Sequence, residues 1–372
     1  MNNTRIIYLD LLRGVSALIV CAGHLRNVLF VDFPQSQIQG IFAKSFYFVT
    51  GLGHEAVMVF FVLSGYFVGG SVLRRLSSFS MKNYLVARIT RLHTVAIPAL
   101  IFTLLIDILI QGVDSSILSG EMYGVFQSGP NSDFSASIIT FIGNLFFLQT
   151  LEVPVFGSNA PLWSLAYEFW FYILFPLLLI ISKRISTSLQ QYWLYCVTFL
   201  IICYFFLNVI GVGFGIWILG TIVFYLHESN SVSKKDSRLK FWITLLLFIA
   251  SLLVSSVHYF GQVVTDLLIG LTLSIHLLYA GKNMVAAEVD SVIDKAKLWL
   301  SDISYSLYAF HFPIVLLMYA LFPKQTQLNL SFRSINLYIL LLVLLLFVGW
   351  LSYILFEANT HSVKRRVRKL IS

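Results

Sequence analysis

Long stretches of apolar residues recur along the whole chain and are separated by short polar segments. A helix of about 20 apolar residues crosses a hydrocarbon core about 30 Å thick. The pattern therefore predicts an all-α polytopic membrane protein with about ten transmembrane helices. The predicted spans are 6–30, 55–73, 92–111, 161–181, 192–207, 211–226, 241–258, 262–280, 303–322 and 335–356. A shorter apolar run, 138–151, predicts a re-entrant or interfacial helix, because it is too short for a full crossing.

Composition supports the membrane class and excludes several others. Of the 372 residues, 58% are hydrophobic and 11% charged, whereas soluble domains carry about 25% charged residues. The three cysteines, Cys21, Cys196 and Cys203, lie within apolar stretches, so we interpret them as packing residues and expect no disulfide or metal framework. We expect a single integral-membrane domain over 1–372.

The basic residues predict the orientation of the chain. With the N-terminus in the cytoplasm, all but four of the 25 lysines and arginines fall on the cytoplasmic side or at its membrane edge. The exceptions are Arg26, Lys44, Lys324 and Arg333. Both termini are therefore predicted to be cytoplasmic, in a bacterial inner membrane. The net charge of +8 is then inner-surface charge, and no nucleic-acid partner is implied. The basic tail, 358–372, is expected to lie against anionic membrane lipid.

The longest extracytoplasmic loop is predicted at 112–160. It contains four acidic residues and no lysine or arginine; the acids are Asp114, Glu121, Asp133 and Glu152. A loop of this length in a compact protein is usually functional or disordered. This loop could cap a substrate entrance.

Two ionisable residues in the first span form the strongest sign of chemistry. Arg13 and His24 are eleven residues apart. On an α-helix, two side chains at this spacing point in directions within roughly 20° of each other and lie about 16 Å apart along the axis. They therefore share one helix face. Ionisable residues inside a membrane are costly and usually face a polar interior, so the pair is a site hypothesis.

Other polar groups in the spans each allow a structural and a functional interpretation. Ser64, with Gly65, either packs helices or lines a site. Arg88 and Arg91 either anchor the inner membrane surface or bind phosphate through their planar forks. Glu168 must be protonated, paired with another helix or open to water.

A late span carries a polar stripe as well. Ser304, Tyr308 and His311 fall on one helix face by their spacing. A lone core histidine is often structural, so both interpretations stay open for His311. No two histidines have the spacing of a helical metal site, and we expect no metal.

Five motifs, taken in order, resemble those of the membrane-bound acyltransferase-3 family. They are Asp10-Leu11-Leu12-Arg13-Gly14 with His24, Phe60-Phe61-Val62-Leu63-Ser64-Gly65-Tyr66, Arg88-Ile89-Thr90-Arg91, Trp163-Ser164-Leu165-Ala166-Tyr167-Glu168, and Ser304-Tyr305-Ser306-Leu307-Tyr308 with His311. The resemblance covers nearly the whole chain. One position departs from it: the family usually has proline where this chain has Thr94, and the nearest proline is Pro98.

The resemblance implies transfer of an acyl group, usually acetyl, from cytoplasmic acetyl-CoA to a hydroxyl of an extracytoplasmic glycan. Typical acceptors are O-antigen, capsule or exopolysaccharide units, free or lipid-linked, and separate glycan-assembly partners are possible. The implied catalytic residues are His24, Glu168 and Arg13. Donor-binding residues would be Arg88, Arg91, Ser304, Tyr305, Tyr308 and His311; acceptor-binding residues would be Trp163, Ser164 and Ser64.

In this scheme neutral His24 takes the proton of the acceptor hydroxyl, and Glu168 orients the imidazole. We expect His24 and Glu168 in the outer half of the membrane, and Arg13 and His311 in the inner half. Whether His24 acts only as a base or is itself acylated stays open. A transporter or flippase without acyl chemistry, or a catalytically silent sensor of the same fold, are the alternatives.

Overall fold

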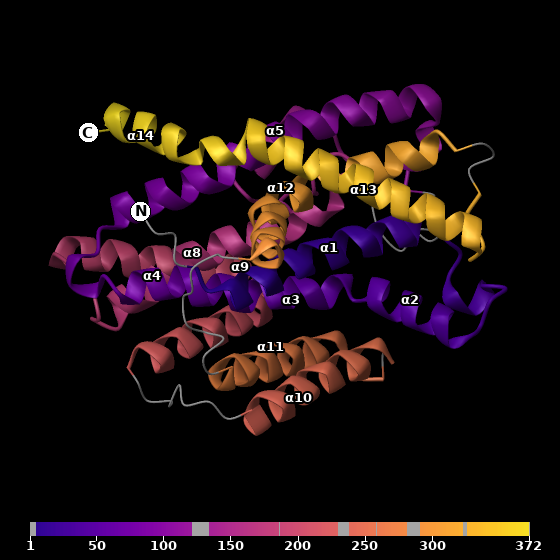
Figure 1. Cartoon of the computed structure of the whole chain (residues 1–372). Coiled ribbons are helices and arrows are strands. Elements are labelled where there is room, and N and C mark those ends of the chain that lie inside the picture. Colours follow the sequence, from indigo (N-terminus) through magenta and orange to yellow (C-terminus); the bar gives the residue numbers. More distant parts are fainter. Residues whose placement is uncertain are drawn as a thin grey trace. The chain divides into compact units, whose positions relative to one another are not determined.

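The computed structural model describes residues 5–120, 134–185, 187–229, 238–257, 259–280, 291–322 and 326–371 (Figure 1). These residues form helices joined by turns and loops, with no β-strand among them. Nine helices of this described part are long and apolar enough to cross a membrane. The predicted fold class, an all-α polytopic membrane protein, is confirmed. The positions Glu121, Asp133 and Lys324 lie outside the described residues.

The helices follow one another with few long connections. The α-helices are α1 (Ile7–Leu29), α2 (Ile41–Gly51), α3 (Gly53–Ser64), α4 (Gly70–Leu73), α5 (Met81–Val113), α7 (Ile138–Leu145), α8 (Trp163–Ile181), α9 (Leu189–Glu228), α10 (Arg238–Ser256), α11 (Gln262–Tyr279), α12 (Val292–Ala320), α13 (Phe332–Leu355) and α14 (Thr360–Ile371). Short 3₁₀ or π turns include η2 (Gly65–Gly69), η5 (Ala160–Leu162) and η8 (Glu357–Asn359).

The chain divides into two compact units. Unit 1 comprises Met1–Arg13, Val57–Arg88 and Tyr167–Trp299, and unit 2 comprises Gly14–Ala56, Ile89–Ala166 and Leu300–Ser372. Each unit is assembled from three separate stretches, so no linker in the sequence marks the division. Helices α1, α5, α8 and α12 begin in one unit and end in the other.

In unit 1, the predicted spans 192–207 and 211–226 form the continuous helical run α9. Three contacts along α8 trace its course: Tyr192 with Ile181, Phe206 with Trp170, and Trp217 with Phe175. The helix therefore lies beside α8 over much of its length. The connection expected between the two predicted spans is itself helical.

In unit 2, α1 and α12 run parallel in close contact. A Cβ on Gly14 would lie 2.9 Å from Leu300 Cγ, so only glycine allows this approach. Ten residues after Gly14 and eleven after Leu300, His24 meets His311. Equal advances along two helices mean parallel axes. The α1–α12 packing therefore fixes which side chains meet at the level of His24.

Helix α7 bears out the expectation of a short helix within 138–151. Its eight residues extend only about 12 Å, too little to cross a membrane. Ile138 and Ile139 are 70% and 72% exposed, whereas Thr140 and Asn144 are buried. An exposed apolar face of this kind fits the interfacial position that the sequence predicts.

Candidate active site

A pair of histidines lies at the centre of unit 2. His24 on α1 and His311 on α12 approach to 2.8 Å between Nδ1 of His24 and Nε2 of His311. The two rings are nearly parallel, with an interplanar angle of 9°. Phe312 packs edge-on against the ring of His24. His311 is 1% exposed, whereas His24 is only partly buried, so His24 is the more exposed member of the pair.

The hydrogen bonds of His311 define the proton positions on both rings. Nδ1 of His311 lies 2.9 Å from the carbonyl oxygen of Tyr308 and 3.1 Å from that of Leu307. Carbonyl oxygens only accept hydrogen bonds, so Nδ1 of His311 carries the proton. With both rings neutral, Nε2 of His311 is then the acceptor and Nδ1 of His24 donates to it. Nε2 of His24 is left with its lone pair.

This contact corrects the difference in depth between His24 and His311 that the sequence predicts. We expected His311 in the inner half of the membrane and His24 in the outer half. Direct contact places them at one level. The reason is that α12 begins at Val292, eleven residues before the predicted span start at 303. His311 therefore lies about 28 Å along its helix, close to the advance of His24 along α1.

One turn before His311, a hydrogen-bond network joins α12 to the start of α8. Tyr308 donates its hydroxyl proton to the carbonyl oxygen of Pro161 and therefore accepts a hydrogen bond from Ser164 Oγ at 2.7 Å. Asn159 Nδ2 donates to the carbonyl oxygen of Ala309 at 2.9 Å. The predicted residues Ser164 and Tyr308 are thus brought together. Both are buried, and their hydrogen bonds connect α12 to the start of α8.

The segment that carries Asn159 is anchored by a buried acid on α5. Asp107 Oδ2 accepts a hydrogen bond from the backbone N–H of Ser158 at 2.9 Å. Asn159 Nδ2 also donates to Thr103 Oγ1 at 3.0 Å. Asp107, Ser158 and Asn159 are each at most 1% exposed. The position of α12 beside α1 therefore depends on polar contacts from α5 as well as on apolar packing.

Glu168 belongs to unit 1, where it has its own group of partners. Its Oε1 accepts a hydrogen bond from Ser64 Oγ at 2.6 Å and another from the hydroxyl of Tyr172. Trp217 Nε1 donates to Ser64 Oγ at 3.1 Å. Glu168 is therefore paired with hydroxyl donors from another helix and from its own. Ser64 therefore belongs to a polar cluster with Glu168.

Its neighbour Gly65 follows the packing interpretation instead. A Cβ on Gly65 would lie 1.8 Å from the carbonyl oxygen of Trp217. The backbones of η2 and α9 therefore touch at this point, which brings Trp217 within reach of Ser64. Close packing at Gly65 and a polar cluster at Ser64 therefore occur side by side, and a role of Ser64 in a binding site stays a prediction.

The two arginines of the third-span motif have different surroundings. The guanidinium of Arg88 lies over the rings of Tyr84 and Tyr172, 5.7 Å and 6.0 Å from their centroids. Arg91 is exposed. Tyr172 contacts both Arg88 and Glu168, so these two predicted residues share one tyrosine. Helix α5 continues unbroken through Thr94 and contains Pro98, so the departure from the family pattern causes no helix break.

Arg13 is paired at the start of α1. Its guanidinium lies 3.3 Å from Asp10 Oδ1, and the same carboxylate binds Arg5 at 2.8 Å. This ion cluster belongs to unit 1. Arg13 and His24 lie on one continuous helix, as the sequence predicts.

The other predicted residues have structural contacts. Ser304 Oγ donates to the carbonyl oxygen of Ser301, one turn back on α12, at 2.7 Å. The hydroxyl of Tyr305 donates to the carbonyl oxygen of Leu92 at 2.9 Å. The indole of Trp163 stacks on the ring of His54 at 6.1 Å.

Several residues of these clusters are not among the predicted site residues, and some of them could have been identified from the sequence. Asp107 is an ionisable residue within the predicted span 92–111, and such residues usually have a functional or structural role. Tyr172 and Asp10 are one turn from Glu168 and Arg13, so helical spacing could have identified them. Asn159 has no such signal, because it precedes a helix in an irregular segment.

The described residues contain no group of three or more histidine, cysteine, aspartate or glutamate side chains that could hold a metal ion. The histidine pair has its own acid–base chemistry. Nδ1 of His24 is hydrogen-bonded to the buried His311, and the lone pair of His24 is on Nε2. This lone pair can accept a proton or act as a nucleophile.

Fold and site together define a multi-pass membrane protein with a polar histidine pair inside a helical unit. The model of the acyltransferase-3 family, described as an acyltransferase domain, matches residues 6–354 of the chain. The chain belongs to this family and is a membrane acyltransferase. No curated protein and no solved structure matches it.

Proposed function

We propose that this protein transfers an acyl group, most simply acetyl, from cytoplasmic acyl-CoA to a hydroxyl of an extracytoplasmic glycan. The acceptor would be a surface polysaccharide unit such as O-antigen, capsule or exopolysaccharide, free or lipid-linked, at a bacterial inner membrane. The family membership supports the acyl transfer. The distribution of basic residues supports a donor on the cytoplasmic side and an acceptor on the other.

One observation carries the chemistry: the hydrogen bond from His24 Nδ1 to His311 Nε2. Because this bond uses Nδ1, the lone pair of His24 is on Nε2. In the reaction, Nε2 takes the proton of the acceptor hydroxyl while its oxygen attacks the thioester carbonyl. The tetrahedral intermediate then expels the CoA thiolate, and the imidazolium returns the proton to that sulfur. The products are the acyl ester and free CoA.

A covalent variant uses the same lone pair. Nε2 of His24 attacks the thioester first and expels the CoA thiolate, which leaves an acyl-imidazolium whose proton stays on Nδ1. The acceptor hydroxyl then attacks the acyl carbon, the bond to Nε2 breaks, Nε2 takes the hydroxyl proton, and this proton passes to the CoA sulfur. His311 is a positioning residue in both variants. Arg88 and Arg91 remain the predicted phosphate contacts of the donor, Arg13 a predicted catalytic group, and Trp163 and Ser164 predicted acceptor contacts. The support of the imidazolium by Glu168 also stays a prediction.

The test uses the full chain in proteoliposomes with radiolabelled acetyl-CoA and glycan extracted from the host surface. His24→Ala should lower label transfer to glycan by about 10²–10⁴-fold, because a general base typically contributes that much. His276→Gln is the matched control. It alters a buried histidine of unit 1 that is bonded to Tyr8 and Thr244.

The outcomes separate the alternatives. Near-normal transfer by a well-folded His24→Ala variant would remove His24 from the mechanism. Movement of glycan across the membrane without label would indicate a transporter or flippase. Label that stays on the protein when glycan is omitted, and that is absent from His24→Ala, would select the covalent variant.

A further inference from the structure

Helix α12 contains a proline close to the histidine pair. Pro313 lies two residues after His311, inside the continuous helix α12. Proline has no backbone N–H, so it cannot donate the hydrogen bond that the carbonyl oxygen four residues earlier would accept. In α12 that carbonyl belongs to Ala309, which is fully buried. A buried carbonyl is unfavourable without a donor, so Ala309 requires one from outside its own helix.

Asn159 provides this donor. Its side-chain Nδ2 donates to the carbonyl oxygen of Ala309 at 2.9 Å, and Asn159 is itself fully buried. The second hydrogen of an amide nitrogen is available for another acceptor, and Nδ2 of Asn159 also donates to Thr103 Oγ1 at 3.0 Å. Asn159 therefore connects the carbonyl group that Pro313 leaves without a backbone donor to the neighbouring helix α5.

Helix α8 of unit 1 shows the same arrangement. Pro176 lies inside α8, and the carbonyl group four residues earlier belongs to Tyr172. That carbonyl oxygen accepts a hydrogen bond from the hydroxyl of Tyr84 at 3.0 Å. In both helices, a side chain from another element replaces the backbone donor that proline lacks. This compensation is the usual way in which a membrane helix tolerates an internal proline.

The contact of Asn159 lies beside the carbonyl group that orients His311. Nδ1 of His311 donates to the carbonyl oxygen of Tyr308 at 2.9 Å, and Tyr308 directly precedes Ala309. Nε2 of the same ring accepts the hydrogen bond from His24 at 2.8 Å. A displacement of α12 at Ala309 would move the Tyr308 carbonyl and the ring of His311 together. The hydrogen bond from His24 would then lengthen.

We propose that Asn159 is a positioning residue for acyl transfer. By replacing the hydrogen bond that Pro313 removes, it fixes the segment of α12 that carries His311. Asn159 acts through the position of His311 beside His24. The inference rests on the proposed function for the reaction that it serves, but the hydrogen-bond arrangement can be tested without any transfer.

The central variant is Asn159→Leu, which approximately keeps the size of the side chain and removes its amide. In proteoliposomes with labelled acetyl-CoA, kcat should fall by roughly 10- to 100-fold, because a displacement of about 1 Å in an active site can cost about 100-fold. KM should change by less than about twofold, since the substrate contacts stay the same. Solid-state ¹⁵N spectra of the histidine-labelled chain should show mixed tautomers of His24 in place of the Nδ1–H form.

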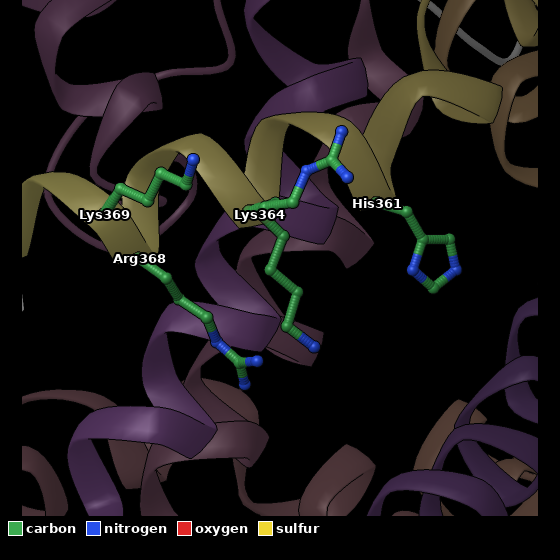
Figure 2. Close-up of a pocket in the computed structure, with 5 residues that line it drawn as sticks. His361, Lys364, Arg368 and Lys369 are labelled. Atoms are coloured by element: carbon green, nitrogen blue, oxygen red, sulfur yellow. The ribbon is translucent and has the colours of Figure 1, made fainter.

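Two controls separate positioning from loss of stability. Tyr84→Phe removes the corresponding hydrogen bond to the Tyr172 carbonyl in unit 1, so it should lower the temperature of thermal unfolding and leave the His24 spectrum unchanged. Arg368→Gln alters an exposed charge on α14 of unit 2, and Figure 2 shows this side chain extending away from its helix. It should leave kcat, the unfolding temperature and the His24 spectrum unchanged.

The part played by Pro313 is tested by a double-mutant cycle. Pro313→Ala returns an N–H to α12, so the Ala309 carbonyl gains a donor within its own helix. Asn159→Leu should therefore lower the unfolding temperature less in the Pro313→Ala background than in the unmodified chain. Equal decreases in the two backgrounds would show that Asn159 does not replace the missing backbone bond, and the proposal would fail.

The histidine spectrum decides between a positioning and a purely structural role. An unchanged kcat together with an unchanged His24 tautomer in Asn159→Leu would overturn the proposal. If this variant does not fold, the double variant with Pro313→Ala takes its place, and an unchanged His24 tautomer there has the same meaning. Normal transfer by His24→Ala would reject the catalytic role of His24, whereas mixed His24 tautomers in Asn159→Leu would still support the positioning of His311 by Asn159.

Discussion

The bond between His24 and His311 makes a quantitative prediction for two substitutions of His311. His311→Phe keeps an aromatic ring at this buried position but removes the acceptor nitrogen. His311→Gln places an amide oxygen near the position of Nε2, so it can still accept the proton of His24 Nδ1. The two variants therefore separate loss of the hydrogen bond from loss of ring packing.

The magnitude follows from the burial of the pair. His311 is 1% exposed, and a buried donor left without its partner costs about 1–3 kcal/mol. The hydrogen bond to His311 favours the His24 tautomer that has its lone pair on Nε2. In His311→Phe this bond is absent and the active tautomer is less populated, so the transfer rate should fall by about 5- to 150-fold. His311→Gln should keep most of the rate. Both should remain more active than His24→Ala.

Two readouts check the reasoning. Label transfer from acetyl-CoA gives kcat and KM, and the loss in His311→Phe should appear in kcat, since the substrate contacts are unchanged. Solid-state ¹⁵N spectra of histidine-labelled protein distinguish the two neutral tautomers. His24 should carry its proton on Nδ1 in the unmodified chain and in His311→Gln, and should show mixed tautomers in His311→Phe. An unchanged kcat together with an unchanged His24 tautomer in His311→Phe would refute the argument.

Two further predictions concern the donor site and the topology. Arg88→Gln and Arg91→Gln should each lower the affinity for coenzyme A, and lysine should restore it only partly because it lacks the fork; unchanged affinity in both would leave these arginines as membrane anchors. A cysteine at Ser115, exposed after α5, should react with an impermeant maleimide in intact cells, whereas one at Ser362, exposed on α14, should react only after the membrane is opened. The opposite labelling pattern would contradict the predicted orientation of the chain.

Hydropathy predicts the spans well where helices are apolar over their whole length. The first span, predicted at 6–30, is α1 (Ile7–Leu29). Hydropathy fails where a helix has polar residues in the part that extends beyond the membrane. The first turns of α12 include Asp294, Lys295 and Lys297, so the sequence pattern placed the start of this helix too late.

The candidate site was predictable only as far as one helix reaches. Periodicity puts Arg13 and His24 on one face of α1, and Tyr308 near His311 on α12. It cannot align α1 against α12, because that alignment depends on the close approach at Gly14 and on contacts such as Asn159 with Ala309. The pairing of two histidines 287 positions apart therefore emerges only in three dimensions.

The carbonyl oxygens of Leu307 and Tyr308, which accept the hydrogen bonds of His311 Nδ1, also affect proton leakage through the membrane. A chain of titratable groups through a bilayer can conduct protons, and a leak of this kind would dissipate the ion gradient. Here the chain from His24 ends at the carbonyl oxygens of Leu307 and Tyr308, which accept a hydrogen bond but do not pass a proton on. A proton taken up by Nε2 of His24 has no onward route through His311 and must return to the reacting groups. The histidine pair thus allows acid–base chemistry inside the membrane while remaining electrically insulated on this side.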